Sequence, residues 1–159
     1  MSETFPHNPL LFDAQDLGPE AQRDLFEKLL LPRMIEEKMM SQLRQGKISK
    51  WFSGLGQEAI SVGVAAAMPR DKFIFPMHRN LGIFTTRDVP LDRLFAQFQG
   101  KDHGFTKGRD RSFHFGSPEH HIVGMISHLG PQLGLADGVA LSDKLDGSGG
   151  CSFVFTGDG

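Results

Sequence analysis

Apolar residues in the first third of the chain recur at the four-residue spacing of one helix face. The positions that form this face are Ile35, Met39 and Leu43. Residues 20–45 are rich in Leu, Met, Glu, Lys and Arg, and Pro19 fits the first turn of a helix. Pro32 interrupts the segment and should kink it or split it into two helices. The pattern therefore predicts a helical region that ends near Gly46.

Short apolar runs alternate with helix-like segments over the rest of the chain. The runs at 73–75 and 151–156 are typical of buried strands. The polar loop at 100–118 is long for a compact domain, and such loops are usually functional or disordered. Helices are expected at residues 56–68, 81–86, 90–98 and 129–145.

This alternation predicts an α/β fold in which helices flank a parallel sheet. Two strands are fewer than such a sheet normally has. We therefore expect one incomplete domain at 18–159 that is truncated after its last strand. Before it, residues 1–17, with Pro6 and Pro9, are expected to form an extended N-terminal arm.

Composition and charge narrow the classes of function. Hydrophobic residues are 39% and charged residues 23% of the 159 positions, which is typical of a soluble globular domain. The formal net charge of −2 gives no electrostatic reason to expect a nucleic acid or a membrane as the main partner. The first Lys or Arg is Arg23, so a secretory or transit leader is not indicated and a cytoplasmic location is expected. The single cysteine, Cys151, is expected inside the last strand as a core residue.

The end of the last predicted strand carries a candidate site for a metal-bound diphosphate. Gly157, Asp158 and Gly159 would lie at the carboxyl edge of the sheet, where open α/β folds bind ligands. The glycines let backbone amides approach phosphate oxygens, and Asp158 can ligate magnesium. His78-Arg79 follows the first predicted strand at the same edge, where the planar arginine fork suits a diphosphate. In an arbitrary protein, a tight turn and a surface salt bridge are the commoner roles of these two motifs.

Residues 54–59 match the pattern Gly-x-Gly-x-x-Ala of nucleotide-binding loops. The residues before them, 50–53, do not have the composition of a strand, and no βαβ unit surrounds the motif. A dinucleotide site is therefore not indicated. The free amides of a helix that begins here could still attract an anion.

The loop at 107–116 is dense in charged and aromatic residues and allows three interpretations. It is an active-site loop that presents His114 to a substrate, a nucleic-acid loop, or a solvated loop whose aromatic residues enter the core. In the second interpretation, basic residues contact phosphates and aromatic residues stack on bases. The residues concerned are Lys107, Arg109, Arg111, Phe113 and Phe115.

Together these segments resemble the alpha subunit of the thiamine diphosphate-dependent 2-oxo acid dehydrogenases, from about residue 25 to residue 159. The resemblance rests on the order and spacing of short motifs at 44–48, 56–59, 62–67, 78–82, 107–109, His114 and 157–159. The segments 108–116 and 127–132 look closer to the branched-chain 2-oxo acid branch than to the pyruvate branch.

The resemblance implies which residues hold the cofactor. His78 and Arg79 fall on a Tyr-Arg pair that binds the diphosphate, with histidine in the place of tyrosine. Residues 157–159 match the opening of the thiamine diphosphate motif, in which Asp158 is a magnesium ligand. The residues whose backbone groups would meet the aminopyrimidine ring are Ser127 and Leu129.

The resemblance also implies a substrate site. His114 matches a loop histidine at the active-site entrance, where it would assist lipoyl transfer or substrate binding. Phe52 aligns near a pocket histidine of the pyruvate branch, and a phenylalanine there would suit an apolar substrate chain.

The implied reaction is oxidative decarboxylation of a 2-oxo acid with acyl transfer to a lipoyl group. The implied partners are the beta subunit of the same enzyme and a lipoyl-bearing acyltransferase. The family motif continues beyond Gly-Asp-Gly, and its activating glutamate comes from the beta subunit, so the chain alone is expected to be inactive. Two alternatives remain: a non-catalytic assembly remnant of that subunit, and an RNA-binding module using residues 107–115, against which the net negative charge argues.

Overall fold

The structure is a computed structural model that describes residues 17–125 and 129–157, so nearly all of the predicted N-terminal arm lies outside the described residues. The elements in chain order are α1 (Pro19–Arg44), α2 (Glu58–Ala67), β1 (Ile74–Phe75), α3 (Leu81–Thr86), α4 (Leu91–Phe98), the 3-10 helix η1 (Pro118–His120), α5 (Pro131–Leu145) and β2 (Phe153–Val154). The helices and strands predicted after residue 55 are confirmed, with ends that differ by no more than two residues.

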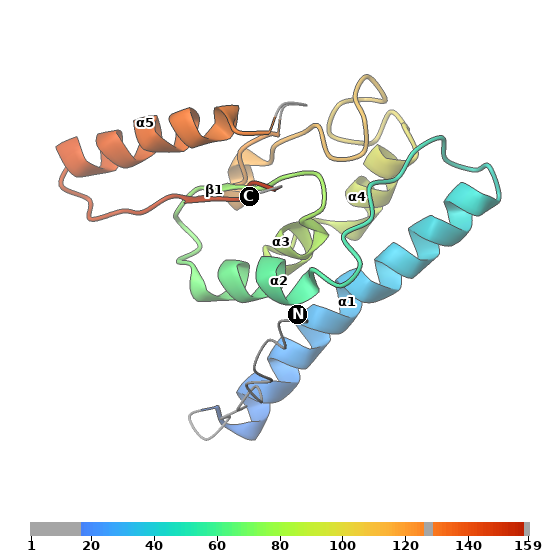
Figure 1. Cartoon of the computed structure of the whole chain (residues 1–159), viewed down its shortest axis with the longest axis horizontal. Helices are drawn as coiled ribbons and strands as arrows, with labels where there is room; N and C mark the ends of the chain where they lie inside the picture. Colours follow the sequence, from blue (N-terminus) through green and yellow to red (C-terminus); the bar gives the residue numbers. More distant parts are fainter. Residues whose placement is uncertain (1–16, 126–128, 158–159) are drawn as a thin grey trace, which may run out of the picture.

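Helix α1 runs along one side of the molecule as an unbroken element (Figure 1). The sequence predicted either a kink or a split into two helices at Pro32, and of these two the split is wrong. Proline removes one backbone donor, but packing of an apolar face supplies most of the stability of a helix in a protein. Pro32 itself is buried, and Ile35 and Met39 are buried in the turns that follow, where α1 packs on α2 and α3.

Strands β1 and β2 pair in parallel, with Ile74 opposite Phe153 and Phe75 opposite Val154. On its other edge, β1 meets the loop after η1, because the Ile74 amide donates to the carbonyl of His121 over 3.0 Å. Figure 1 shows α5 on one side of this strand pair and α2 and α3 on the other. The predicted α/β arrangement with a parallel sheet is thus present as two short paired strands flanked by helices.

The last strand is only partly covered. Cys151 is exposed and lies two residues before β2 begins, so the prediction that it is a core residue inside the strand is wrong. The apolar run begins at Cys151, but pairing with β1 starts only at Phe153, whose side chain is 43% exposed. The part of the run that packs on the core is Phe155.

An aromatic cluster joins α3, α4 and the loop that follows α4. Trp51 lies with its ring centroid 5.0 Å from that of Phe98 and 5.2 Å from that of Phe113. Phe84 lies 5.0 Å from Phe115 by the same measure. The long loop is therefore held by its own aromatic residues, as the third interpretation of residues 107–116 proposed.

Candidate active site

The segments that leave β1 and β2 meet at one edge of the strand pair. After β1 the chain makes a tight turn, in which the Met77 amide donates to Oδ1 of Asn80 over 2.9 Å. The turn carries His78 and Arg79. A Cβ atom placed on Gly157 would lie 3.3 Å from Nη2 of Arg79 and 3.4 Å from Sδ of Met77. The structure thus brings Arg79 and Gly157 together, while Asp158 and Gly159 lie outside the described residues.

The Arg79 side chain has a polar atom without a partner. Its Nε atom is buried and forms no hydrogen bond with any residue that the structure describes. Buried donors in proteins are nearly always paired, because an unmade hydrogen bond costs about 1–3 kcal/mol. An arginine fork with a spare donor, close to the backbone of Gly157, is the kind of group that binds phosphate oxygens.

Phe52 and His78 are direct neighbours. Their ring centroids are 4.7 Å apart, with an angle of 62° between the ring planes. The ammonium group of Lys50 lies over the Phe52 ring, 4.8 Å from its centroid. Phe52 is half-buried, so an apolar ring lies beside the segment that carries Arg79.

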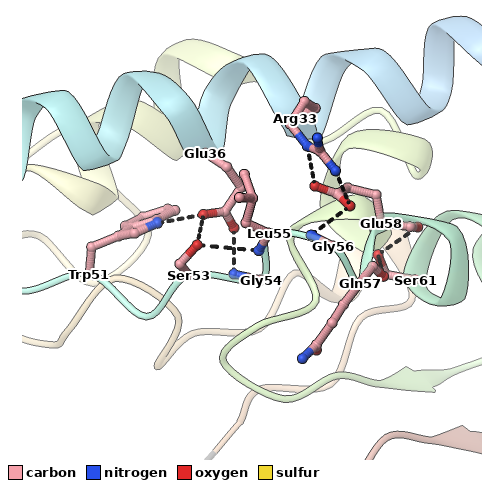
Figure 2. A network of polar contacts seen from close by, with 10 residues as sticks. All are labelled: Arg33, Glu36, Trp51, Ser53, Gly54, Leu55, Gly56, Gln57, Glu58 and Ser61. Atoms are coloured by element: carbon pink, nitrogen blue, oxygen red, sulfur yellow. Dashed lines mark hydrogen bonds and ion pairs between the residues drawn. The ribbon is translucent and has the colours of Figure 1, made fainter.

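Sequence reasoning missed the residue that fixes this region, which is Glu36 of α1. Glu36 is 1% exposed, and its carboxylate accepts hydrogen bonds from Trp51 Nε1 over 2.7 Å, Ser53 Oγ over 3.0 Å and the Gly54 amide over 2.9 Å. Figure 2 shows these three donors converging on Glu36 from the link between α1 and α2, residues 45–57. The available signal was an acidic residue on a buried helix face, four positions after Pro32.

Gly54 connects this hydrogen-bond network to Arg79, the candidate diphosphate-binding residue. A Cβ atom at position 54 would lie 2.1 Å from the carbonyl oxygen of Arg79 and 3.4 Å from Oε1 of Glu36. Only a glycine allows the two backbones to come so close. Glu36 therefore holds the backbone that packs directly against Arg79.

The amino terminus of α2 is occupied by its own first residue, Glu58. Arg33 donates to Glu58 through Nε over 2.7 Å and through Nη2 over 3.0 Å, and the Gly56 amide donates to the same carboxylate over 2.9 Å (Figure 2). The bond from Arg33 is the main cause that lowers the pKa of Glu58. Because this carboxylate already takes the Gly56 amide, the structure gives no support to an anion site at the Gly-x-Gly motif.

The contribution of Glu58 to stability is expected to depend on pH. Its pKa is lower in the folded chain than in the unfolded one, so its stabilisation is present above the ordinary carboxyl range and is lost as the pH falls through the lowered value. Glu58→Gln should cost about 1 kcal/mol at neutral pH and progressively less in acid. Urea unfolding of both forms across this pH range measures the difference; a gap that stays constant into acid would contradict the expectation.

His114 lies in the loop after α4, where it is half-buried beside Lys50 and Arg111. Burial lowers the pKa of His114 from its ordinary value, and the nearby charges of Arg111 and Lys50 lower it further, while Asp110 opposes them. A neutral imidazole at neutral pH is suited to accept a proton. Lys50 lines the same hollow as His114 and also lies over the Phe52 ring. Lys50 therefore connects His114 with the part of the link that carries Phe52.

The nucleic-acid interpretation of this loop is wrong in its stacking step. Phe113 is 2% exposed and Phe115 is 4% exposed, because both belong to the aromatic core cluster. Neither ring is available to a base. The basic residues Lys107, Arg109 and Arg111 are exposed, as that interpretation expected.

The remaining predicted site residues are only partly described. Ser127 lies outside the described residues, and Leu129, just before α5, is 39% exposed. Within residues 17–125 and 129–157, no three His, Cys, Asp or Glu side chains converge as a metal would require. In the same part of the chain, no helix combines the length and the apolar character needed to cross a bilayer.

Comparison with known proteins identifies the family. The protein-family model described as dehydrogenase E1 component matches residues 27–159. The chain belongs to the dehydrogenase E1 component family.

Curated relatives of this E1 component chain agree with the branch that its motifs indicated. It is 31% identical over 135 residues to the mitochondrial 2-oxoisovalerate dehydrogenase subunit alpha of Dictyostelium discoideum, a match that covers 85% of this chain and 31% of the relative. It is 30% identical over 143 residues to the human subunit of the same name, a match that covers 90% of this chain and 32% of the relative. The resemblance to alpha subunits of the branched-chain branch is confirmed, and the chain spans about a third of the length of these relatives.

Proposed function

We propose that this chain forms the diphosphate-binding part of a thiamine diphosphate-dependent 2-oxo acid dehydrogenase. The observation that carries the proposal is the buried Nε of Arg79, which has no partner among the described residues and belongs to the guanidinium beside Gly157. A guanidinium with spare donors binds phosphate oxygens through charge-assisted hydrogen bonds. Membership of the dehydrogenase E1 component family supports the same assignment.

Each predicted site residue has a role in this proposal. Arg79 would pair with the diphosphate and His78 would donate a further hydrogen bond to it. Asp158 would hold the magnesium ion, and backbone groups of Ser127 and Leu129 would orient the aminopyrimidine ring. Thiamine, when bound, supplies the electron sink for decarboxylation, and the protein supplies binding and orientation.

The proposed substrate is a branched-chain 2-oxo acid. The relatives are named for 2-oxoisovalerate, and Phe52 offers an apolar ring beside His78, where a branched aliphatic chain would be favoured over a polar one. His114, with a pKa below its ordinary value, would take up a proton during substrate binding or lipoyl transfer. The overall reaction would be oxidative decarboxylation with acyl transfer to a lipoyl group.

The proposed partners are a beta subunit and a lipoyl-bearing acyltransferase. Helix α5 supports a protein partner, because it exposes several large apolar side chains while contacting β2 beneath it. These side chains are Leu133, Leu135, Leu141 and Leu145. Apolar side chains gathered on one exposed helix indicate a protein interface. A cytoplasmic location stays a prediction, and the relatives compared above carry the word mitochondrial in their names.

Calorimetric titration of the chain with thiamine diphosphate and Mg²⁺ tests the proposal. Arg79→Gln is expected to weaken binding about tenfold, because one charge-assisted hydrogen bond is worth about 1.5 kcal/mol or more. Arg23→Gln is the matched control, since Arg23 is exposed on α1. Thiamine without its diphosphate should bind far more weakly than the cofactor.

Two results would count against the assignment. Equal affinity of Arg79→Gln and the unchanged chain would exclude Arg79 as the diphosphate ligand. Failure to distinguish thiamine diphosphate from thiamine, both in the unchanged chain and in a version extended beyond Gly159, would favour the alternative of a non-catalytic assembly remnant.

A further inference from the structure

A cavity of about 830 Å³ lies between the link from α1 to α2, the end of α4 and the loop at 108–114. Four cationic side chains line it, together with His114. The four are Lys47, Lys50, Arg109 and Arg111. Asp110 is the only acidic residue among the described residues that line the cavity.

The positive charge of this cavity is not neutralised within the described part of the chain. None of its four cationic side chains forms an ion pair with a described carboxylate. Burial is the main cause that lowers the pKa of His114, and the charges of Arg111 and Lys50 lower it further against the opposing effect of Asp110. Like charges gathered around one hollow attract anions and raise their local concentration.

The loop that carries two of these cations is fixed before any ligand arrives. Gln97 of α4 is 1% exposed, and its amide nitrogen donates to the carbonyl of Arg111 over 3.1 Å. The Thr106 amide donates back to Oε1 of Gln97 over 3.0 Å. Gly108 has a φ of +74°, and a Cβ there would lie 2.6 Å from the carbonyl oxygen of Gly100. A side chain of α4 therefore determines where Arg109 and Arg111 stand.

We propose that this cavity is a second anion-binding site, for a small molecule that carries two or more phosphate or carboxylate groups. Its volume lies within the range of about 300–1,000 Å³ of small-molecule sites in proteins. Cations contributed by two separate segments suit a ligand with charge at two or more positions. The cavity is separate from the proposed diphosphate site, because neither Arg79 nor Gly157 lines it, and it shares only His114 with the proposed substrate site.

Nuclear magnetic resonance titration of the whole 159-residue chain with inorganic tripolyphosphate, and separately with citrate, tests this site at low ionic strength. The expected result is a saturable shift of the His114 ring signals and of the amide signals of residues 108–112. The pKa of His114 should rise when the anion binds, since the added negative charge offsets Lys50 and Arg111 while Asp110 stays unchanged. The double variant Lys50→Gln/Arg111→Gln should weaken binding at least tenfold.

Two control variants distinguish binding in this cavity from binding at Arg79 and from attraction by net charge. Arg79→Gln should leave tripolyphosphate binding at the cavity unchanged, whether or not it weakens thiamine diphosphate binding. Lys38→Gln, which removes an exposed cation from α1 outside the cavity, should change the affinity less than twofold.

Several outcomes would overturn the inference. The first is an unchanged anion affinity in the double variant, and the second is loss of the His114 shift in Arg79→Gln. The third is a loss of affinity in Lys38→Gln as large as that in the double variant, which would indicate attraction by net charge alone. Binding of an acidic peptide with no saturable response to either small anion would also overturn it and would identify the cavity as a protein-docking surface.

Discussion

Replacing Glu36 by leucine is expected to destabilise the chain by about 3 kcal/mol. The substitution conserves volume approximately but removes the acceptor of three donors, those of Trp51, Ser53 and Gly54. Each buried donor left without a partner costs about 1–3 kcal/mol, and partial exposure of the link reduces the sum. Urea unfolding measures the change through the midpoint, provided that the slope stays constant.

The neighbouring residue Glu37 supplies the control. It is exposed on the same helix, so Glu37→Leu should alter stability by no more than about 0.5 kcal/mol. Glu36→Gln should fall between the two, because the amide retains one acceptor oxygen but turns an NH₂ group towards the remaining donors. Equal stability of Glu36→Leu and Glu37→Leu would show that the buried carboxylate does not hold the link.

The functional consequence of Glu36→Leu follows from the contact between Gly54 and Arg79. Loss of the Gly54 anchor frees the backbone on which the Arg79 carbonyl rests. If the proposed function is right, the affinity for thiamine diphosphate should fall in the folded variant, measured well below its unfolding midpoint. Anion binding at the cavity around His114 should change less, since its loop is anchored by Gln97.

The arrangement of helices and strands could be predicted because it depends on local patterns. Short apolar runs predicted β1 and β2, and apolar spacing predicted α4, since burial of one face imposes that period on the sequence. The effect of Pro32 could not be predicted from its own preference, because distant residues of α2 and α3 pack on the turns around it. Local preference is a weak guide where tertiary packing opposes it.

The candidate site shows the same division. Arg79 and Gly157 could be placed at one edge because parallel strands end together. Glu36 was overlooked because its three donors lie 15 to 18 residues away, and a single sequence does not show which donors will face a buried acid. Gly54 belongs to a sequence pattern typical of nucleotide-binding loops, but the structure requires a glycine there because its backbone packs closely on that of Arg79.

Gly54→Ala is the second substitution with a large expected effect, about 3 kcal/mol of lost stability. The new methyl group would lie 2.1 Å from the carbonyl oxygen of Arg79, which is backbone and not the movable end of a side chain. Relief requires the link or the turn at Met77–Asn80 to shift, and forced overpacking of this kind costs about 1–3 kcal/mol or more. Unfolding by urea at neutral pH, compared with the unchanged chain, measures the loss.

Gly63→Ala is the matched control for this substitution. Gly63 lies within α2, and a Cβ there would meet nothing within 4 Å, so alanine should stabilise the helix by up to about 1 kcal/mol. The same chemical change is therefore expected to lower the stability in Gly54→Ala and to raise it in Gly63→Ala. If Gly54→Ala were as stable as the unchanged chain, the close approach of the two backbones would be wrong.

Ligand binding by Gly54→Ala separates displacement of Arg79 from general loss of structure. A displaced Arg79 would weaken thiamine diphosphate binding at least tenfold at a temperature where the variant is fully folded, while tripolyphosphate binding beside His114 stays intact. Parallel loss of thiamine diphosphate binding and tripolyphosphate binding would instead indicate that the whole link between α1 and α2 has moved. The link contributes to both sites, because Lys50 lines the cavity and Gly54 packs against Arg79. Retention of both would show that the Arg79 backbone tolerates the shift and that its guanidinium, not its main chain, determines affinity.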